Sequence, residues 1–328
     1  MDIIQLIVLF ILFIIVMDIF FPENAFTKLV PLKHNSHDNL DIEYIPIENY
    51  YIENYSNLSS LTRSKIFIHI PSEMNQRKWL DFGSRNTTSL NLPLSELCIQ
   101  SIIKNCSTKY DIIIYNNSTV NKLFTDESET DLCNIKKPEL LSGIDLKQWE
   151  HYCKAKILSK YGGVVMEPNF FFMKCPSRHI LFPNQFTICN IPNEGKNVSQ
   201  HSNVPNSFYI MSSPKNDSNL EIYVKYLHEL CVKHYSEDHK HFDKTYEKLH
   251  LLPSYDPALL GIKDNNDEYI NASDILDSHN DLLLNKNCFC LFINIDYFKK
   301  YRKHGWVLRM DPQQLRSSNT FLSRVMKA

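Results

Sequence analysis

A pair of adjacent glycines and the polar residues that follow it mark the part of the chain best suited to bind a ligand. Gly162 and Gly163 precede the apolar run VVM in a chain that has only 7 glycines among 328 residues. Two glycines allow the backbone to leave a helix through a left-handed residue and to approach a neighbouring segment closely. Glu167 and Asn169 follow the apolar run. Because ligands of α/β proteins bind beyond the carboxyl ends of strands, we expect Glu167 at a binding site.

The segment before the glycine pair must position this site. Its apolar spacing predicts a helix over about residues 149–160, in which His151, Lys154 and Leu158 have the spacing i, i+3 and i+7. Such a spacing places the three side chains on one stripe, and Leu158 is expected to face a sheet. His151 and Lys154 are therefore aimed either at the site or at the rim of the helix, where their heads reach water.

Short apolar runs alternate with helical stretches along the rest of the chain, which predicts an α/β domain with a mixed, mostly parallel sheet. The helices are expected at 93–104, 149–160 and 219–233. The strands are expected at 66–70, 111–115, 163–166, 170–173, 186–190, 207–211 and 288–295.

The block around the glycine pair resembles a known family of sugar transferases. Lys154, Leu158 and the sequence Tyr161-Gly162-Gly163 are followed at fixed spacing by Glu167 and Asn169. This arrangement is similar to that of the DXD-containing glycosyltransferase family 32. The resemblance extends over about residues 65–310, and the glycine block is its specific part. It implies a GT-A fold, in which a nucleotide sugar binds to an α/β sandwich.

The resemblance also implies a role for each residue of the block. The two Asp residues of a DXD motif hold Mn²⁺ or Mg²⁺ against the diphosphate of the donor, since hard cations prefer carboxylate oxygens. Glu167 and Asn169 match these two positions, and are therefore the expected metal ligands and catalytic residues. His151, Lys154, Gly162, Gly163 and Asp256 are the expected donor-binding residues. Asp256 is included because Tyr255-Asp256-Pro257 resembles a Thr-Gly-Pro segment of the family.

Charged positions of the family pattern are substituted in this chain. Asn169 offers a carbonyl oxygen without a charge, His151 stands where the family has Asp, and Lys154 stands where it has Arg. Lysine keeps the positive charge but lacks the two-pronged guanidinium. These changes predict a weakened cation site.

The N-terminus has the composition of a membrane anchor. Residues 3–21 are apolar except for Gln5 and Asp18, a length that spans a ~30 Å hydrocarbon core. Asp2 precedes the run and Pro22 follows it, without the basic start and small-residue cleavage site of a signal peptide. We therefore expect an uncleaved single-pass anchor at 1–21, a stem at 22–62 and a GT-A-like domain at 63–328.

The overall charge and composition leave two functions open. A net charge of −2 argues against a nucleic-acid-binding protein. The first function is a membrane-anchored glycosyltransferase that uses a nucleotide sugar, a divalent cation, and a glycan or protein as acceptor, with retention at the anomeric carbon as the resemblance suggests. The second is a catalytically degenerate relative with a structural or binding role. The Asn- and Lys-rich composition is compatible with a large DNA virus, so the membrane is expected to be a Golgi- or ER-type host membrane or that of a virion.

Overall fold

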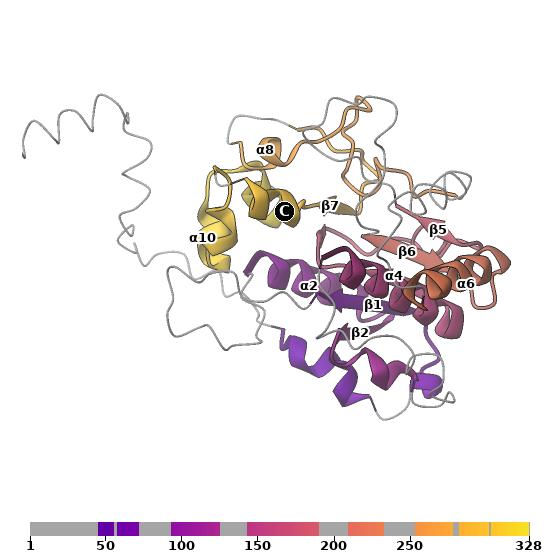
Figure 1. Cartoon of the computed structure of the whole chain (residues 1–328). Coiled ribbons are helices and arrows are strands. Elements are labelled where there is room, and N and C mark those ends of the chain that lie inside the picture. Colours follow the sequence, from indigo (N-terminus) through magenta and orange to yellow (C-terminus); the bar gives the residue numbers. More distant parts are fainter. Residues whose placement is uncertain are drawn as a thin grey trace, which may run out of the picture. The chain divides into compact units, whose positions relative to one another are not determined.

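The computed structural model describes residues 45–55, 58–71, 93–124, 143–189, 209–232, 253–277, 282–301 and 303–327 (Figure 1). All of them belong to one compact unit, Ile45–Ala328. The expected membrane anchor at 3–21 lies outside the described residues. Among the helices that are described, none combines the length and apolarity needed to cross a membrane.

The main sheet of the described chain has five strands in the order β2-β1-β3-β6-β5. β1 pairs in parallel with both β2 and β3, and β6 is antiparallel to β3 and to β5. Four of these strands therefore run in one direction and β6 runs against them, which confirms a mixed, mostly parallel sheet. The strands are Lys65–Ile70 (β1), Asp111–Asn116 (β2), Gly163–Met166 (β3), Thr187–Ile188 (β5) and Ile210–Ser213 (β6).

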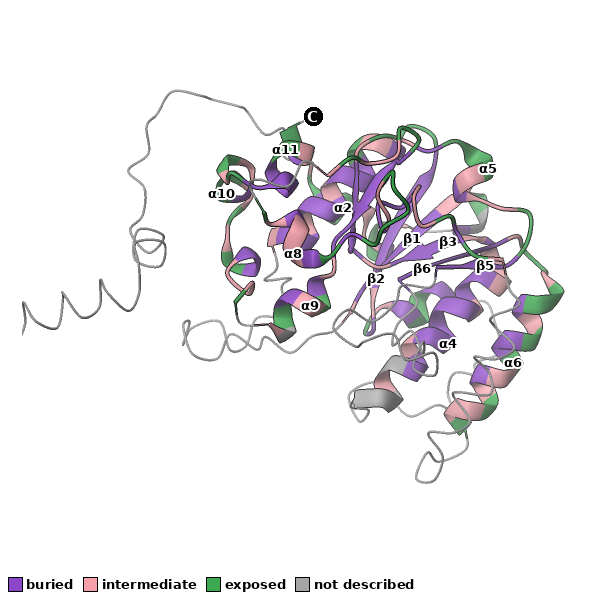
Figure 2. Cartoon of the chain, turned by 90° about the horizontal axis from the view of Figure 1, so that it is seen from above, coloured by how far each residue is buried: buried purple, intermediate pink, exposed green. Residues whose placement is uncertain are grey.

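Helices cover the sheet on both faces (Figure 2). On one face, α2 (Pro93–Cys106) packs its isoleucines against Ile66, Ile112 and Val164. On the other, α4 (Gly143–Tyr161) lies beside α6 (Ser218–Val232). Both helices belong to the apolar cluster that contains Phe67. Since successive side chains of a strand point to opposite faces, each strand contributes alternate residues to the two layers.

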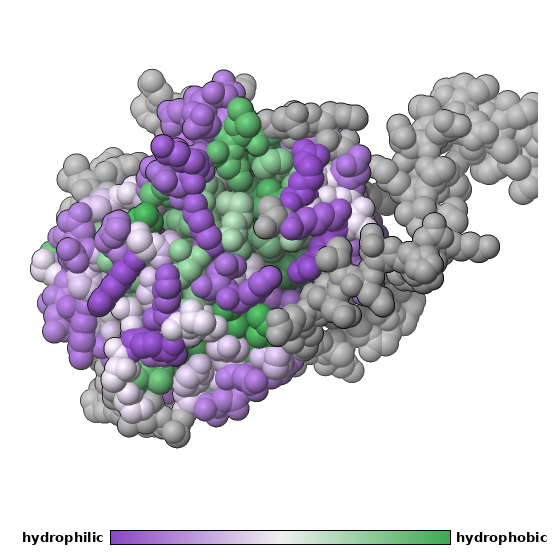
Figure 3. All heavy atoms as spheres, turned by 180° about the vertical axis from the view of Figure 1, so that it is seen from behind, coloured by the Kyte–Doolittle hydropathy of each residue, from purple (hydrophilic) through white to green (hydrophobic). Residues whose placement is uncertain are grey.

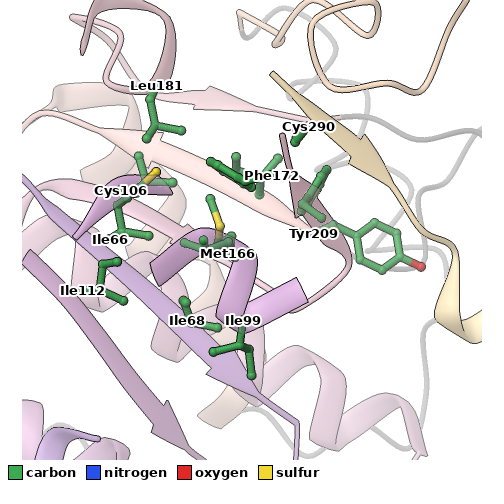
Figure 4. Packing of buried hydrophobic residues seen from close by; sticks show 14 of the residues in the cluster. Ile66, Ile68, Ile99, Cys106, Ile112, Met166, Phe172, Leu181, Tyr209 and Cys290 are labelled. Carbon is green, nitrogen blue, oxygen red and sulfur yellow. The ribbon is translucent and has the colours of Figure 1, made fainter. Parts of the chain in front are cut away.

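Two expected strands form a separate sheet rather than joining the main one. β4 (Phe170–Phe172) pairs antiparallel with β7 (Cys290–Phe292), and α2 packs against β4. The rings of Phe170 and Phe292 lie 5.4 Å apart, which helps to hold this pair. Both strands add aromatic side chains to the α2 face of the core, as Figure 4 shows for Phe172.

Several short helices were not predicted from the sequence. They are α5 (Arg178–Leu181), α8 (Ala272–Ile275), α9 (Ile295–Lys300), α10 (Pro312–Ser317) and α11 (Phe321–Lys327), with 3-10 turns η5 (Val120–Phe124) and η7 (Val307–Arg309). Those after residue 270 form a third apolar cluster with the first turns of α2. Their lengths are too short for helical periodicity to reveal them.

The compact unit begins earlier than the expected domain start at residue 63. Residues of the expected stem form the 3-10 turns η1 (Ile47–Tyr50), η2 (Ile52–Asn54) and η3 (Leu58–Ser60). Ile47, Ile52 and Leu58 are buried in the two main clusters. Part of the expected stem therefore belongs to the compact unit, because isolated apolar residues anchor an otherwise polar segment to it.

The exposed apolar side chains of the described residues come from separate segments of the chain. Figure 3 shows one side of the molecule as largely hydrophilic, with an apolar stretch between polar side chains. The exposed large apolar residues among those described are Ile222, Val232, Tyr269 and Leu283, which come from different segments. Single exposed apolar side chains of this kind are common in globular proteins.

Candidate functional site

The glycine pair forms the tight turn that the sequence predicted. α4 ends at Tyr161, and the backbone N–H of Gly162 donates to the carbonyl of Leu158 at 2.7 Å. Gly162 and Gly163 have φ values of 65° and 108°. A Cβ atom on Gly163 would lie 2.5 Å from the carbonyl oxygen of Lys65, and one on Gly162 would lie 2.9 Å from the Lys215 nitrogen. Only glycine therefore allows the turn to lie this close to the backbone of Lys65 and Lys215.

This turn places Glu167 at the carboxyl end of β3, beside the carboxyl end of β1. Met166 is the register partner of Ile68, so Glu167 continues the strand next to His69. The Glu167 backbone N–H donates to the carbonyl of Tyr209, where β6 begins, at 2.8 Å. The sheet order reverses beside β1, since β2 and β3 lie on its two sides. Such a reversal is where α/β proteins usually bind their ligands.

Lys154 of α4 reaches Glu167 and makes an ion pair with it. The ammonium group donates to Glu167 Oε1, and the Lys154 side chain is only 1% exposed, against 13% for Glu167. Lys154 therefore lies within the site and not at the rim of its helix. Burying an ammonium group is costly unless a carboxylate accompanies it, so each of these two charges depends on the other.

His151 lies one turn before Lys154 on α4 and is also buried, with 3% of its surface exposed. Gln148, one turn further back, is buried as well. Gln148, His151 and Lys154 therefore form the buried polar part of the stripe that ends in Leu158. Of the two expected donor-binding residues on it, Lys154 contacts Glu167.

Asn169 is buried next to the site, and its backbone connects β3 to the C-terminal part of the chain. Its N–H donates to the Glu167 carbonyl at 2.8 Å, and its carbonyl accepts from the Ile293 N–H at 2.7 Å. Beyond Ile293, the carboxylate of Asp296 accepts a hydrogen bond from the Tyr209 hydroxyl at 3.2 Å. Sequence reasoning missed Asp296, because no residue near it in the sequence indicates that it contacts Tyr209 at the start of β6.

Four further polar residues of the site were also missed by sequence reasoning. His69 Nε2 lies 2.7 Å from Asn117 Oδ1, and Asn117 Nδ2 donates to Glu150 Oε1 at 2.6 Å. His69 and Tyr115 are register partners on β1 and β2, and their rings lie 5.1 Å apart. With Glu167 next to His69, the three strands present one row of polar side chains to α4. The sequence could have indicated this row, because residues two apart in a strand share a face. His69 therefore lies on the same face of β1 as Phe67, and Tyr115 on the same face of β2 as Ile113.

The hydrogen bonds determine which ring nitrogen of His69 carries the hydrogen. Because Asn117 donates to Glu150 through its amide nitrogen, its oxygen accepts, and His69 Nε2 must carry the hydrogen. Burial, and then the nearby charge of Lys154, lower the pKa of His69 to about 3. His69 is therefore neutral near pH 7, with its Nδ1 lone pair facing no hydrogen-bond donor of the described residues.

Tyr115 is the second buried group of this row whose polar atom has no partner among the described residues. Burial raises the pKa of its hydroxyl well above the usual value, and Cys153 and the carboxylates of Glu150 and Glu167 raise it further. The hydroxyl therefore stays protonated. A protonated donor and a neutral acceptor side by side suit a water molecule or a ligand hydroxyl, which both accepts and donates.

Asp256 is not brought to this cluster. It is exposed in a turn where its carboxylate accepts from the Ala258 N–H at 2.9 Å. The preceding Ser254 bridges to Ile188 of β5, at the far side of the sheet from β1. Three strand spacings separate this position from β3, which corresponds to about 14 Å. The similarity of residues 255–257 to the family segment therefore does not place Asp256 beside Glu167.

The charges at the end of β3 fit a divalent cation poorly. A cation on Glu167 would share that carboxylate with the Lys154 ammonium. At roughly 4 Å and an effective dielectric constant of about 20, a double and a single positive charge repel by about 8 kcal/mol. Asn169 provides no negative charge to compensate. Within the described ranges there is also no group of three or more His, Cys, Asp or Glu side chains suited to a metal ion.

The cysteines of the described residues are free thiols, and most of them are buried. Burial raises the pKa of Cys98, Cys189 and Cys290 above the usual thiol value. These thiols stay protonated and act as small apolar side chains. Cys133 lies outside the described residues.

Comparison with known proteins adds no assignment to this geometry. No protein-family model matches the chain, and no curated protein matches it.

Proposed function

We propose that the chain is a glycosyltransferase-like protein that binds a nucleotide sugar at the carboxyl ends of β1 and β3. The observation that supports this most directly is the glycine turn that presents Glu167 there, with the buried Lys154 ammonium against it. Structural ion pairs are usually exposed, and a buried pair gives little net stability compared with apolar packing. A pair kept at the ligand-binding edge of the sheet is therefore better explained by ligand binding.

The polar row suits a sugar nucleotide in its chemistry as well. The described cluster combines a buried ammonium group, carboxylates, an amide and the protonated Tyr115 hydroxyl. Sugar hydroxyls both donate and accept, and carboxylate–ammonium pairs satisfy both roles. The glycine turn removes side chains where the backbone must approach a ligand, as the resemblance to sugar transferases implies.

In the proposed reaction, an acceptor hydroxyl bonds to the anomeric carbon, and the bond from that carbon to the diphosphate oxygen breaks. Negative charge develops on the departing diphosphate, and one of its oxygens takes up the proton of the acceptor hydroxyl. The role proposed for Lys154 is to supply positive charge near the leaving group. Glu167 holds that ammonium in place, and His69 remains neutral throughout.

Binding of nucleotide sugars to the full chain in mild detergent tests this proposal. UDP- and GDP-linked hexoses are titrated against wild type, Glu167→Gln and Asp256→Asn by calorimetry. We expect one of them to bind wild type and Asp256→Asn alike, and Glu167→Gln to bind it at least tenfold more weakly. Asp256→Asn is the matched control because it removes a carboxylate from outside the cluster. Equal binding by Glu167→Gln, or none by any variant, would contradict the proposed site.

A transfer assay separates an active enzyme from the degenerate alternative. Release of the nucleoside diphosphate in the presence of a glycan or protein acceptor indicates an enzyme. Nucleotide-sugar binding without any release favours a structural or binding role for the same fold.

We also propose that residues 3–21 attach the protein to a membrane as a single-pass anchor. The support is the length of the apolar run and its lack of a cleavage site. Carbonate extraction of membranes tests it, and recovery of the full-length chain in the soluble fraction would contradict it.

A further inference from the structure

The Lys154–Glu167 pair differs from what a DXD-type cation site requires. In such a site, two carboxylates attract a divalent cation, and the cation in turn neutralises a diphosphate that those carboxylates would repel. Here the residues at the same place are Glu167, the neutral Asn169 and the buried Lys154. The formal charge of these three residues is zero before any ligand arrives.

Two consequences follow from this charge count. These three residues together offer a divalent cation no net electrostatic attraction, and the cation must compete with Lys154 for the Glu167 carboxylate. A diphosphate, in turn, meets no net negative charge from these three residues, so it needs no bridging cation to approach them.

The ammonium group also has hydrogen-bonding capacity left for a ligand. An ammonium group has three N–H donors. Among the described residues, Glu167 is the hydrogen-bond acceptor of the Lys154 ammonium group. Tyr115 adds a protonated hydroxyl of the same row, buried and without a partner in the described chain. Phosphate or sugar oxygens can accept hydrogen bonds from these two buried donor groups.

We propose that Lys154 takes the place of the divalent cation, so that Glu167 binds no metal and the donor binds without one. The second part of this inference, that the donor binds without a metal, rests on the proposed function. Its first part, the exclusion of metal from Glu167, is independent of any nucleotide.

A Mn²⁺ titration of the full chain tests the first part by electron paramagnetic resonance, which detects loss of the free-ion signal. We expect wild type to leave millimolar Mn²⁺ free. The Lys154→Met/Asn169→Asp double variant should bind it at least tenfold more tightly, because two carboxylates then face the site without a competing ammonium. Lys156→Met/Asn169→Asp is the matched control, since Lys156 lies on the same helix and the pair at Glu167 remains. Mn²⁺ binding by wild type that Glu167→Gln abolishes would overturn the inference.

Nucleotide-sugar binding by wild type tests the second part without any variant that might fail to fold. We expect affinities within twofold of each other in the presence of a chelator and of Mn²⁺. An affinity at least tenfold higher with Mn²⁺ would overturn the inference while leaving the proposed function standing. Absence of binding under both conditions would instead overturn the proposed function and the role of Lys154 in donor binding. The Mn²⁺ titration alone then decides whether Lys154 keeps cations from Glu167.

Discussion

The two helices that cover opposite faces of the sheet are built on different principles. α2 buries isoleucines, leucines and cysteines, together with Ser95 and Ser101. α4 buries Gln148, His151 and Lys154 on the face that meets the same strands. Both helices lie against a sheet whose central residues are fully buried, so the difference does not come from solvent exposure.

The α2 face shows what this fold needs for stability alone. Its side chains from β1, β2, β3 and α2 interlock in an apolar layer, and the Tyr209 hydroxyl at its margin points away from the packed residues (Figure 4). Ser95 and Ser101 are the buried polar residues of α2, and Ser101 is satisfied because it donates to the Cys98 carbonyl and accepts from the Phe172 N–H. The α4 face holds a charged pair, and His69 Nδ1, the Tyr115 hydroxyl and Gln148 Oε1 have no hydrogen-bond partner among the described residues. The contrast indicates that α4 serves a ligand as well as the core.

The largest expected effect comes from breaking the buried ion pair from the side of its carboxylate. Glu167→Gln leaves the almost fully buried Lys154 ammonium without a counter-charge, and should cost about 3–5 kcal/mol of unfolding free energy. Lys154→Met should cost less, because Glu167 retains access to water. Chemical denaturation measures both, and Glu53→Gln, from an exposed pair with Lys122, should cost under about 1 kcal/mol. Equal costs for Glu167→Gln and Glu53→Gln would show that the pair is not buried in solution.

The next effect concerns the glycine turn that separates α4 from β3. Gly163→Ala adds a Cβ to a residue whose φ is 108°, and this Cβ would lie 2.5 Å from the Lys65 carbonyl oxygen. We expect a loss of about 3 kcal/mol, measured by thermal or chemical unfolding. Gly162→Ala, at φ 65°, should cost about 1–2 kcal/mol. Unchanged stability of Gly163→Ala would contradict the tight approach of β3 to β1.

A pH-dependent effect should distinguish the polar face from the apolar one. The pKa of His69 is lowered from 6.5 to about 3 in the folded protein, so below pH 6.5 the unfolded chain binds a proton that the folded chain does not. Stability should therefore fall as the pH drops from 6.5, by about 2 kcal/mol at pH 5 from this residue. His69→Gln should remove that part of the slope, while the exposed His179→Gln should follow wild type. An unchanged slope in His69→Gln would mean that His69 is protonated in the folded state.

The smallest effect is expected on the apolar face. Ile102→Val removes one methylene from α2 at a fully buried position, at a cost of about 0.5–1.5 kcal/mol. Because α2 lies on the other face of the sheet from Lys154, nucleotide-sugar affinity should not change. A calorimetric titration checks this, and a tenfold loss of affinity would show that the two faces are not separate in function.

Local sequence patterns determined much of this architecture. The short apolar runs in KIFIHI and DIIIYN predict buried strands, and the double glycine predicts the turn after α4. The spacing of His151 and Lys154 placed them on one stripe of the helix. These features depend on neighbours within about one or two turns of chain, so the physical causes are present in the sequence itself.

Tertiary structure decided which distant residues meet. Lys154 and Glu167 are 13 residues apart, and their pairing depends on the glycine turn folding α4 back over β3. Asn117 and Glu150 meet from β2 and α4, 33 residues apart, and Asp296 reaches Tyr209 over 87 residues. Asp256 shows the opposite case, because a similar local segment lies at the far edge of the sheet. Strand order and register are set by the packing of whole layers, and no local pattern contains that information.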